Sequence, residues 1–264
     1  MEAIYSPQNP KIKELVKLHD RRYRYEKGRF LIEGLRELSR AFDKGISIDE
    51  VYYSEQDFKG PEFSEFLKQI QEAQIPTFPV TPEVFRKGSH REGPDGLIGV
   101  AEHWNLPLTE LRLSTNPFLL VVENIEKPGN LGSLIRSAES AGVDGMIVCN
   151  PVVDLFNPNV VRNSQGALFS LPITVVDNAS ALQFLQRNHI QIIATTPHSQ
   201  ILFWDVDMKQ PVAILLGSEK DGLSNFWLQN TDLHVKIPQQ GKADSLNVNI
   251  AASLTLYEAL RQRR

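Results

Sequence analysis

The stretch that decides the fold runs from Phe118 to Gly142 and reads FLLVVENIEKPGNLGSLIRSAESAG. Its opening, FLLVV, is a continuous apolar run of the kind that forms a strand buried inside a parallel sheet. A proline–glycine turn follows, Asn130 is a suitable helix cap, and Gly142 is a suitable helix end. A strand, a turn and a helix in this order predict one unit of an α/β domain.

The same alternation continues to the end of the chain, which predicts a parallel sheet covered on both faces. Further strands are expected at 144–150, 172–176, 190–196, 212–218 and 233–238, and helices at 157–168, 181–189, 225–230 and near the C-terminus. In such sheets, ligands bind beyond the carboxyl ends of the strands. The functional residues are therefore expected in the loops that follow these strands.

The first part of the chain predicts a smaller α/β unit of its own. Strand-like runs at 28–34, 48–54, 75–80 and 96–102 alternate with helical patterns at 35–45, 61–74 and 81–87. This alternation ends in HWNLPLTELRLSTNP, which contains two prolines and several polar residues. We therefore expect a first domain over 1–105, a linker over 106–116 and a second domain over 117–264.

Composition excludes several classes of protein. The 264 residues are 41% hydrophobic with a net charge of −4, so the chain can bury a core and is not basic throughout. The single cysteine, Cys149, rules out a disulfide framework or a cysteine-based zinc site within one chain. No apolar run approaches the ~20 residues of a membrane span, and the N-terminus lacks a signal-like apolar region. These features favour a cytoplasmic protein without a membrane partner.

A basic segment with interleaved tyrosines lies near the N-terminus, in KIKELVKLHDRRYRYEKGR. Basic side chains neutralise phosphates, and the rings of Tyr23 and Tyr25 can stack on unpaired bases. A solvated helix face explains the same pattern equally well. The sequence alone leaves both interpretations open.

Three glycine-bearing segments follow expected strands in the second part. They are ENIEKPGNLGSLIRSAESAG, LLGSEKDGLS and IPQQGKADSLNVNIA. In the last, Ser245, Asn247 and Asn249 alternate with apolar residues where a helix begins, although capping needs only one such side chain. Dinucleotide, P-loop, zinc-protease and nucleophile-elbow motifs are absent, and the six histidines are scattered, so no metal site is predicted.

Taken in order, these segments resemble those of the SpoU/TrmH family, RNA 2′-O-ribose methyltransferases of the SPOUT superfamily. The likeness covers about 117–264, VRNSQGALFSLPI is similar to the family's intermediate segment, and the early chain is similar to its substrate-binding domain. The matching residues are Asn130, Gly132 and Arg136 in the first segment, Gly217, Glu219 and Gly222 in the second, and Ile237, Pro238, Ser245, Leu246 and Asn247 in the third. Lys127 departs from the pattern, in which an acidic residue is frequent at this position.

The resemblance implies a C-terminal parallel-sheet SPOUT methyltransferase domain with a deep trefoil knot, and a smaller N-terminal α/β substrate-binding domain. It also implies a homodimer whose active site uses residues of both subunits, and S-adenosylmethionine as the methyl donor. The catalytic residues it implies are Asn130, Arg136, Glu219, Ser245 and Asn247. The residues it implies for donor binding are Thr195, Leu216, Gly217, Ile237, Gln239 and Leu246.

The chemistry of these residue types suits methyl transfer to a ribose hydroxyl, because polar groups can stabilise the alkoxide that develops. Arg136 is the family's catalytic arginine, but a guanidinium keeps its charge in proteins, so gripping a phosphate suits it better than accepting a proton. Ribosomal RNA is the expected substrate. Transfer RNA, a non-catalytic RNA-binding or assembly protein of the same fold, and a nucleotide enzyme unrelated to RNA are the alternatives.

Overall fold

The structure is a computed structural model that describes residues 3–91, 93–241 and 245–264. By its internal contacts the chain divides into two units. Unit 1 holds the residues up to Trp104 together with Asp154–Phe169, and unit 2 holds Asn105–Val153 and Ser170–Arg264. The segment 154–169 thus leaves the second half of the chain to fold with the first, which the sequence did not indicate.

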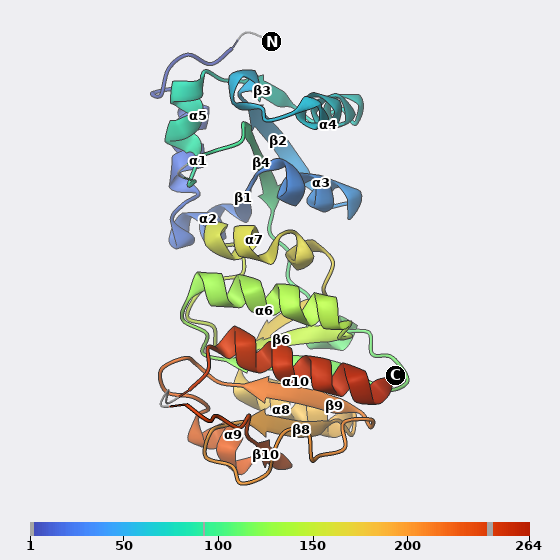
Figure 1. The fold of residues 1–264 in the computed structure, drawn as a ribbon. Helices are drawn as coiled ribbons and strands as arrows, with labels where there is room; N and C mark the ends of the chain where they lie inside the picture. Colours follow the sequence, from blue (N-terminus) through green and yellow to red (C-terminus); the bar gives the residue numbers. More distant parts are fainter. Residues whose placement is uncertain (1–2, 92, 242–244) are drawn as a thin grey trace. The chain divides into compact units, whose positions relative to one another are not determined.

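Unit 1 is built on a four-stranded sheet in the order β1-β4-β2-β3, in which β4 is antiparallel to both its neighbours and β2 is parallel to β3. Helices α1 and α5 lie on one face of the sheet and α3 and α4 on the other (Figure 1). The elements of this unit are α1 (Pro10–Lys17), α2 (Arg21–Lys27), β1 (Arg29–Glu33), α3 (Leu35–Asp43), β2 (Ile48–Tyr53), α4 (Pro61–Glu72), β3 (Thr77–Pro79), α5 (Pro82–Gly88), β4 (Leu97–Glu102) and α7 (Pro158–Ser164).

Helix α7, from the 154–169 segment, packs against the edge strand β1. Phe156 precedes it and lies against the rings of His103 and Phe30, with ring centroids 4.2 and 4.7 Å apart. Asp154 forms a fully buried ion pair with Arg24 of α2 at 2.7 Å. The basic N-terminal segment therefore forms two helices. One of its arginines, Arg24, is buried in an ion pair inside unit 1 and is not exposed to solvent.

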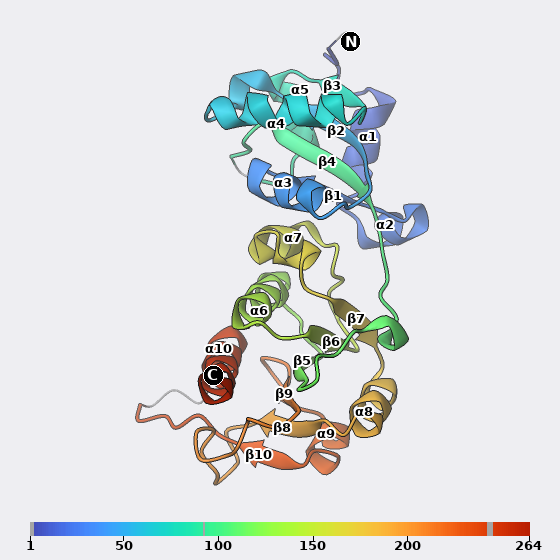
Figure 2. The ribbon, with the colours of Figure 1, turned by 90° about the vertical axis from the view of Figure 1, so that its right-hand side faces the viewer.

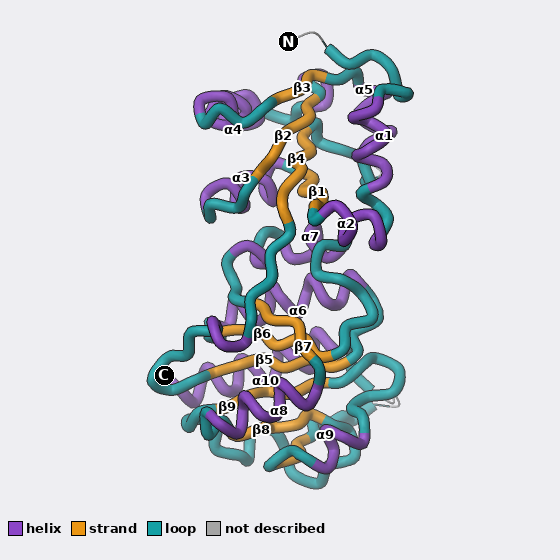
Figure 3. The backbone as a smooth tube through the Cα atoms, turned by 180° about the vertical axis from the view of Figure 1, so that it is seen from behind, coloured by secondary structure: helices purple, strands orange, loops and turns teal. Residues whose placement is uncertain are grey.

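Unit 2 contains the parallel sheet that the sequence predicts. Its six strands have the order β10-β8-β9-β5-β6-β7, and every neighbouring pair is parallel. Helices α6 and α10 cover one face, and α8 and α9 cover the other (Figures 2 and 3). The elements are β5 (Phe118–Glu123), α6 (Pro128–Ala141), β6 (Gly145–Cys149), β7 (Ile173–Val176), α8 (Asn178–Arg187), β8 (Gln191–Thr195), β9 (Val212–Leu216), α9 (Asn225–Gln229), β10 (Leu233–Val235) and α10 (Val248–Arg263).

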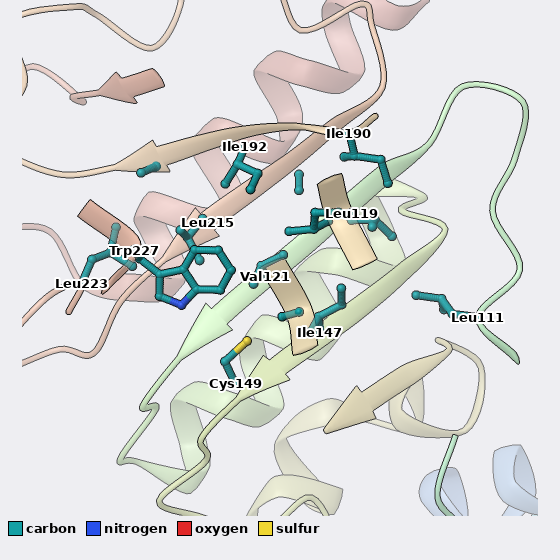
Figure 4. Packing of buried hydrophobic residues seen from close by; sticks show 14 residues of the cluster. Leu111, Leu119, Val121, Ile147, Cys149, Ile190, Ile192, Leu215, Leu223 and Trp227 are labelled. Atoms are coloured by element: carbon teal, nitrogen blue, oxygen red, sulfur yellow. The ribbon is translucent and has the colours of Figure 1, made fainter. Parts of the chain in front are cut away.

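Because helices cover both faces of the sheet, its strands read as continuous apolar runs. On the face under α8 and α9, the alternate side chains Leu119 and Val121 of β5 belong to the same buried cluster as Trp227 of α9, and Val121 lies beside that ring (Figure 4). Leu111, from the stretch expected to be a linker, is only 6% exposed and belongs to the same cluster. Residues 105–116 therefore pack as part of unit 2.

The C-terminal helix α10 is apolar on two sides. One side packs against α6 and the sheet through Ala252, Leu256 and Ala259, which are fully buried. The other side leaves Ile250, Leu254 and Tyr257 between 42% and 52% exposed. Within the described ranges, none of the helices is both long and apolar enough to cross a membrane.

Candidate active site

The expected site segments all follow strands of the parallel sheet in unit 2. The loop after β5 leads to Asn130, the loop after β9 carries Glu219, and the chain beyond β10 leads to Ser245 and Asn247. Parallel strands end at one edge of a sheet, so these loops meet although they lie far apart in the sequence.

Asn130 is the centre of a hydrogen-bonded group. Its side-chain nitrogen donates to a carboxylate oxygen of Glu219. Its side-chain oxygen accepts from the amides of Asn249, at 2.8 Å, and Asn247, at 3.5 Å. Glu219 also accepts from the backbone N–H of Glu126 at 3.5 Å. Four polar side chains from three segments thus form one connected group.

The polar start of α10 is explained by a division of roles. Asn247 caps the helix, because its side-chain oxygen accepts from the backbone N–H of Asn249 at 2.9 Å. Its amide nitrogen and that of Asn249 turn instead toward Asn130. Ser245 is exposed and lines the neighbouring pocket. Only Asn247 caps the helix, whereas Asn249 contacts Asn130 and Ser245 lines the pocket.

The loop that carries Glu219 is a tight turn that depends on two glycines. Ser218 and Gly222 exchange both backbone hydrogen bonds, at 3.0 and 3.1 Å. A Cβ on Gly217 would overlap the backbone of Gly222, and Gly222 has φ +67°, which favours glycine. The turn holds Glu219 at its tip beside Asn130.

A pocket of about 450 Å³ opens next to this group. Glu219 and Ser245 line it, and Thr195 contributes a buried hydroxyl that has no hydrogen-bond partner among the described residues. All six residues expected to bind the methyl donor lie in its wall: Thr195, Leu216, Gly217, Ile237, Gln239 and Leu246. Apolar side chains and a few polar groups in one concave site are typical of a small-molecule pocket.

Arg136 stands apart from this group. It lies on α6, its side chain is exposed, and it has no hydrogen-bond or ionic partner within the described residues. The structure brings Asn130, Glu219 and Asn247 together and places Ser245 in the adjoining pocket, but it does not join Arg136 to them within one chain.

Two residues of the site were not assigned a role from the sequence. Glu123 ends β5 with 0% exposure and accepts from Ser224, through both its backbone N–H and its hydroxyl, and from the amide of Asn178, at 2.6–2.8 Å. It therefore ties the end of the Glu219 loop to the sheet. The sequence signal for Glu123 was a single acidic residue at the end of an apolar strand. The second residue without an assigned role is Asn249, whose position in the sequence is also that of an ordinary capping residue.

Glu123 also affects Cys149, its neighbour across the β5–β6 pair. Burial, followed by the charges of Glu123 and Asp177, raises the pKa of the Cys149 thiol to about 12. The thiol is therefore a core group rather than a nucleophile. Over the described part of the chain, no cluster of three or more His, Cys, Asp or Glu side chains is arranged to hold a metal ion.

Comparison with known proteins agrees with this geometry. The model of the SpoU rRNA Methylase family matches residues 117–257, and that of the MRM3-like substrate binding domain matches residues 9–99. The chain belongs to the SpoU rRNA methylase family. Its parallel-sheet domain is thus a SPOUT methyltransferase domain, preceded by an α/β substrate-binding domain.

Relatives of the whole chain are known in sequence and in structure. The 23S rRNA (uridine(2479)-2′-O)-methyltransferase of Streptomyces viridochromogenes is 32% identical and aligns over 93% of this chain and 87% of its own. A crystal structure of an RNA 2′-O ribose methyltransferase is 41% identical, with a TM-score of 0.88 and 99% of both chains covered. The AdoMet-bound rRNA methyltransferase of Sinorhizobium meliloti is 28% identical, with a TM-score of 0.89 and coverage of 98% and 97%.

Proposed function

We propose that this protein transfers a methyl group from S-adenosylmethionine to a ribose 2′-hydroxyl of ribosomal RNA. The observation that carries the proposal is the hydrogen-bonded group of Asn130, Glu219 and Asn247 at the mouth of the donor-sized pocket. Two of the named relatives, those of Streptomyces viridochromogenes and Sinorhizobium meliloti, are named as rRNA methyltransferases, which favours ribosomal over transfer RNA.

The pocket suits the donor in shape and chemistry. Leu216, Ile237 and Leu246 offer apolar wall to the adenosyl group, and the unpaired hydroxyl of Thr195 is free to bond it. Gly217 shapes the pocket wall because the backbone of Gly222 occupies the place that a side chain would take, which allows the tight turn after β9. When bound, the donor supplies a methyl group on a positive sulfonium and leaves as a neutral thioether, so no leaving-group acid is required.

The residues around Asn130 would act on the ribose. The 2′-hydroxyl is a weak nucleophile that must lose its proton as it attacks, so groups that stabilise the developing alkoxide lower the barrier. Ser245 and the amides of Asn130 and Asn247 are such groups, and the carboxylate of Glu219 fixes how the Asn130 amide points. We assign Arg136 the role of gripping a substrate phosphate with its planar guanidinium.

We also propose a homodimer in which Arg136 serves the site of the partner subunit. Two features of unit 2 support it: Arg136 has no partner among the described residues of its own chain, and α10 exposes an apolar stripe of Ile250, Leu254 and Tyr257. A stripe at helical spacing on one helix is a surface that a second copy can cover by twofold symmetry.

The topology implied by the family is a trefoil knot near the C-terminus, and we propose it here. It is supported by the backbone bonds of Lys236 to Ile201 and Phe203, after which the chain reaches the same pocket as the loops following β8 and β9. Closing the termini of an experimentally determined chain trace tests it. A ribosomal target also implies that the enzyme acts in the cytoplasm.

Two measurements test the proposed activity. Calorimetry should show binding of S-adenosylmethionine, and absence of binding at millimolar donor would contradict the pocket assignment. Mapping of ribose methylation in ribosomal and transfer RNA, with and without the gene, should reveal one site lost in ribosomal RNA. A site lost only in transfer RNA would favour that substrate, and an unchanged map with intact RNA binding would favour a non-catalytic protein.

A further inference from the structure

A basic surface in unit 1 combines α3, the loop before β4 and α7, and the proposed function does not account for it. We call it the α3–α7 surface and define it by Arg36, Arg40, His90, Arg91 and Arg162. All five belong to unit 1, because α7 folds with that unit. Arg36, Arg40, His90 and Arg162 are exposed, and Arg91 is 20% exposed in its side chain.

Contacts of α7 with the loop before β4 and with α3 hold this surface together. At the start of α7, the side chain of Asn159 meets the ring of His90 at 3.3 Å. At its end, Arg40 donates to the backbone oxygen of Gln165. Arg162 lies between these two contacts in the chain, and it lines a small hollow together with His90 and Arg91. Helix α7 is therefore held by the loop before β4 at its start and by α3 at its end, and its Arg162 is exposed to solvent.

Most acids near this surface are buried beneath it or paired, although Asp43 is exposed one turn after Arg40 on α3. Glu33 and Glu37 are 7% and 4% exposed. Glu33 accepts from the hydroxyl of Ser89 and the backbone N–H of His90, both at 2.7 Å, so it anchors the loop. Burial raises the pKa of Glu37, with the charge of Arg91 opposing the rise. Asp95 is held by Arg91 at 3.2 Å. The groups that reach solvent are thus mainly guanidinium groups.

Neither the Arg36 nor the Arg162 side chain has a hydrogen bond or an ion pair among the described residues, although the charge of Arg36 acts on the neighbouring Glu37 and opposes the rise of its pKa. Arg36 and Arg40 lie four residues apart on one face of α3, so their side chains point to the same side. Guanidinium groups with free donors bind phosphate oxygens in pairs of parallel hydrogen bonds.

We infer that the α3–α7 surface binds the phosphate backbone of the RNA substrate, a proposal that rests on the proposed function. The segment that carries Arg162 continues directly into β6 on one side and β7 on the other. RNA held on α7 is therefore tethered to the catalytic sheet through two short connections, besides the one at residue 104. The intermediate segment VRNSQGALFSLPI thereby acquires a role in RNA binding.

The basic-tyrosine segment of α1 and α2 is the competing surface. There, Lys17 and Lys27 lie over the ring of Tyr23 at 5.6 Å, and Arg21 lies over that of Tyr25 at 5.8 Å. Arg24 is buried, and Lys11 pairs with Glu50. Lys13 and Arg22 remain exposed in this segment without a side-chain partner among the described residues, so both surfaces offer open cations. We favour the α3–α7 surface because guanidinium groups dominate it and because Arg162 lies on the segment that connects β6 with β7.

Charge reversal in the full-length protein tests the inference. Arg36→Glu and Arg162→Glu are compared with Arg187→Glu, an exposed arginine of α8 in unit 2, and with Arg22→Glu on α2. Binding of a 23S ribosomal RNA transcript is measured over a range of salt concentrations. Each of the first two variants should weaken binding about tenfold or more, and lower the slope of log K against log salt by roughly 0.7–0.9 for each phosphate that the variant no longer neutralises. The Arg187 variant should bind like the wild type.

Donor binding and thermal unfolding are measured on the same variants and should not change. Unaltered RNA affinity and slope in Arg36→Glu and Arg162→Glu would overturn the inference, as would a loss confined to Arg22→Glu. Failure of the proposed function gives a different result, because the wild-type protein would then fail to bind the donor or leave ribosomal RNA unmethylated, whatever the RNA affinities of the variants.

Discussion

Asn249 donates its side-chain amide to the oxygen of Asn130 over 2.8 Å, and the nitrogen of Asn130 in turn donates to Glu219. An asparagine amide can be turned by 180° with little change in shape, so its direction is set by its partners. Because Asn249 presents a donor, the oxygen of Asn130 faces α10 and its nitrogen faces the Glu219 loop. Asn249 is thus a positioning residue for the group that we place around the ribose.

Replacing Asn249 should therefore lower kcat with little effect on donor affinity. Asn249→Ala removes one hydrogen bond, worth about 1 kcal/mol, and should slow turnover about fivefold to tenfold. Asn249→Asp presents only acceptors to Asn130, so it should turn that amide around and cost more than alanine does. Ser253→Ala, which breaks the 2.9 Å bond to Ser137 elsewhere between α6 and α10, is the control. Equal loss in all three variants would mean a purely structural role.

Arg136 should matter for RNA and catalysis but not for the donor. Arg136→Ala should lower kcat/KM for RNA by about 100-fold or more, because it removes a pair of charge-assisted hydrogen bonds to the phosphate, worth about 3 kcal/mol in total. Arg136→Lys should recover only part of it, because an ammonium lacks the planar fork. Calorimetry with S-adenosylmethionine should give wild-type affinity. Loss of donor binding in Arg136→Ala would instead assign the residue to the cofactor.

The parts of the structure that the sequence predicts depend on residues close together in the chain, whereas the parts that it does not predict depend on contacts between distant residues. The strand from Phe118 to Glu123 and the helix ending at Gly142 follow from local pattern, and the structure confirms both. The pairing of Asp154 with Arg24 spans 130 residues, and a helix such as α7 looks the same in sequence whichever unit it packs against. Patterns of three or four residues encode elements, whereas partners across the chain are selected by packing.

The site shows the same limit. We expected Asn130 and Glu219 to lie close together, but only because of the resemblance to a family. Neither segment contains a sequence feature that indicates contact with the other. Glu123 was read as the end of a strand, and its three hydrogen bonds connect β5 with the first residue of α8 and the residue before α9, which lie 55 and 101 residues later. A buried carboxylate reveals its role only when its donors are known.

The exposed stripe of α10 should be the dimer interface. Leu254→Glu and Tyr257→Glu would place charges in an apolar contact and should convert the dimer to a monomer, measured by light scattering after gel filtration. Ile201→Glu, at a residue that is 43% exposed outside α10, is the matched control. A wild-type protein that is already monomeric would contradict the proposal.

A mixing experiment then asks whether Arg136 serves the partner subunit. Asn130→Ala and Arg136→Ala should each be inactive alone, because every site in these homodimers lacks one group. Unfolding and refolding them together should restore activity, since one site of each mixed dimer would combine an intact Asn130 with an intact Arg136. No recovery, with mixed dimers demonstrated, would mean that both residues act within one chain.

The buried pair of Arg24 and Asp154 should be essential to unit 1. Asp154→Ala leaves the guanidinium with only the backbone oxygens of Leu18 and His19 and should cost about 3–5 kcal/mol of unfolding free energy. Lys11→Ala, which breaks a partly exposed pair with Glu50, should cost at most about 1 kcal/mol. Urea titration measures both. For the same reason, deleting residues 1–105 would strip the 154–169 segment of its partners, so point variants are the better probes of RNA binding.

Alkaline pH should destabilise the protein partly through Cys149. Its pKa is raised to about 12 in the folded chain, so the folded state holds the thiol proton more tightly than the unfolded state does. This contribution to stability is intact below the ordinary thiol pKa of about 8.5 and is lost as pH rises toward the folded value. Between pH 7 and pH 10, the wild type should lose more thermal stability than Cys149→Ala. Native protein at pH 8 should also resist iodoacetamide and react once unfolded, whereas rapid native labelling would contradict the burial of the thiol.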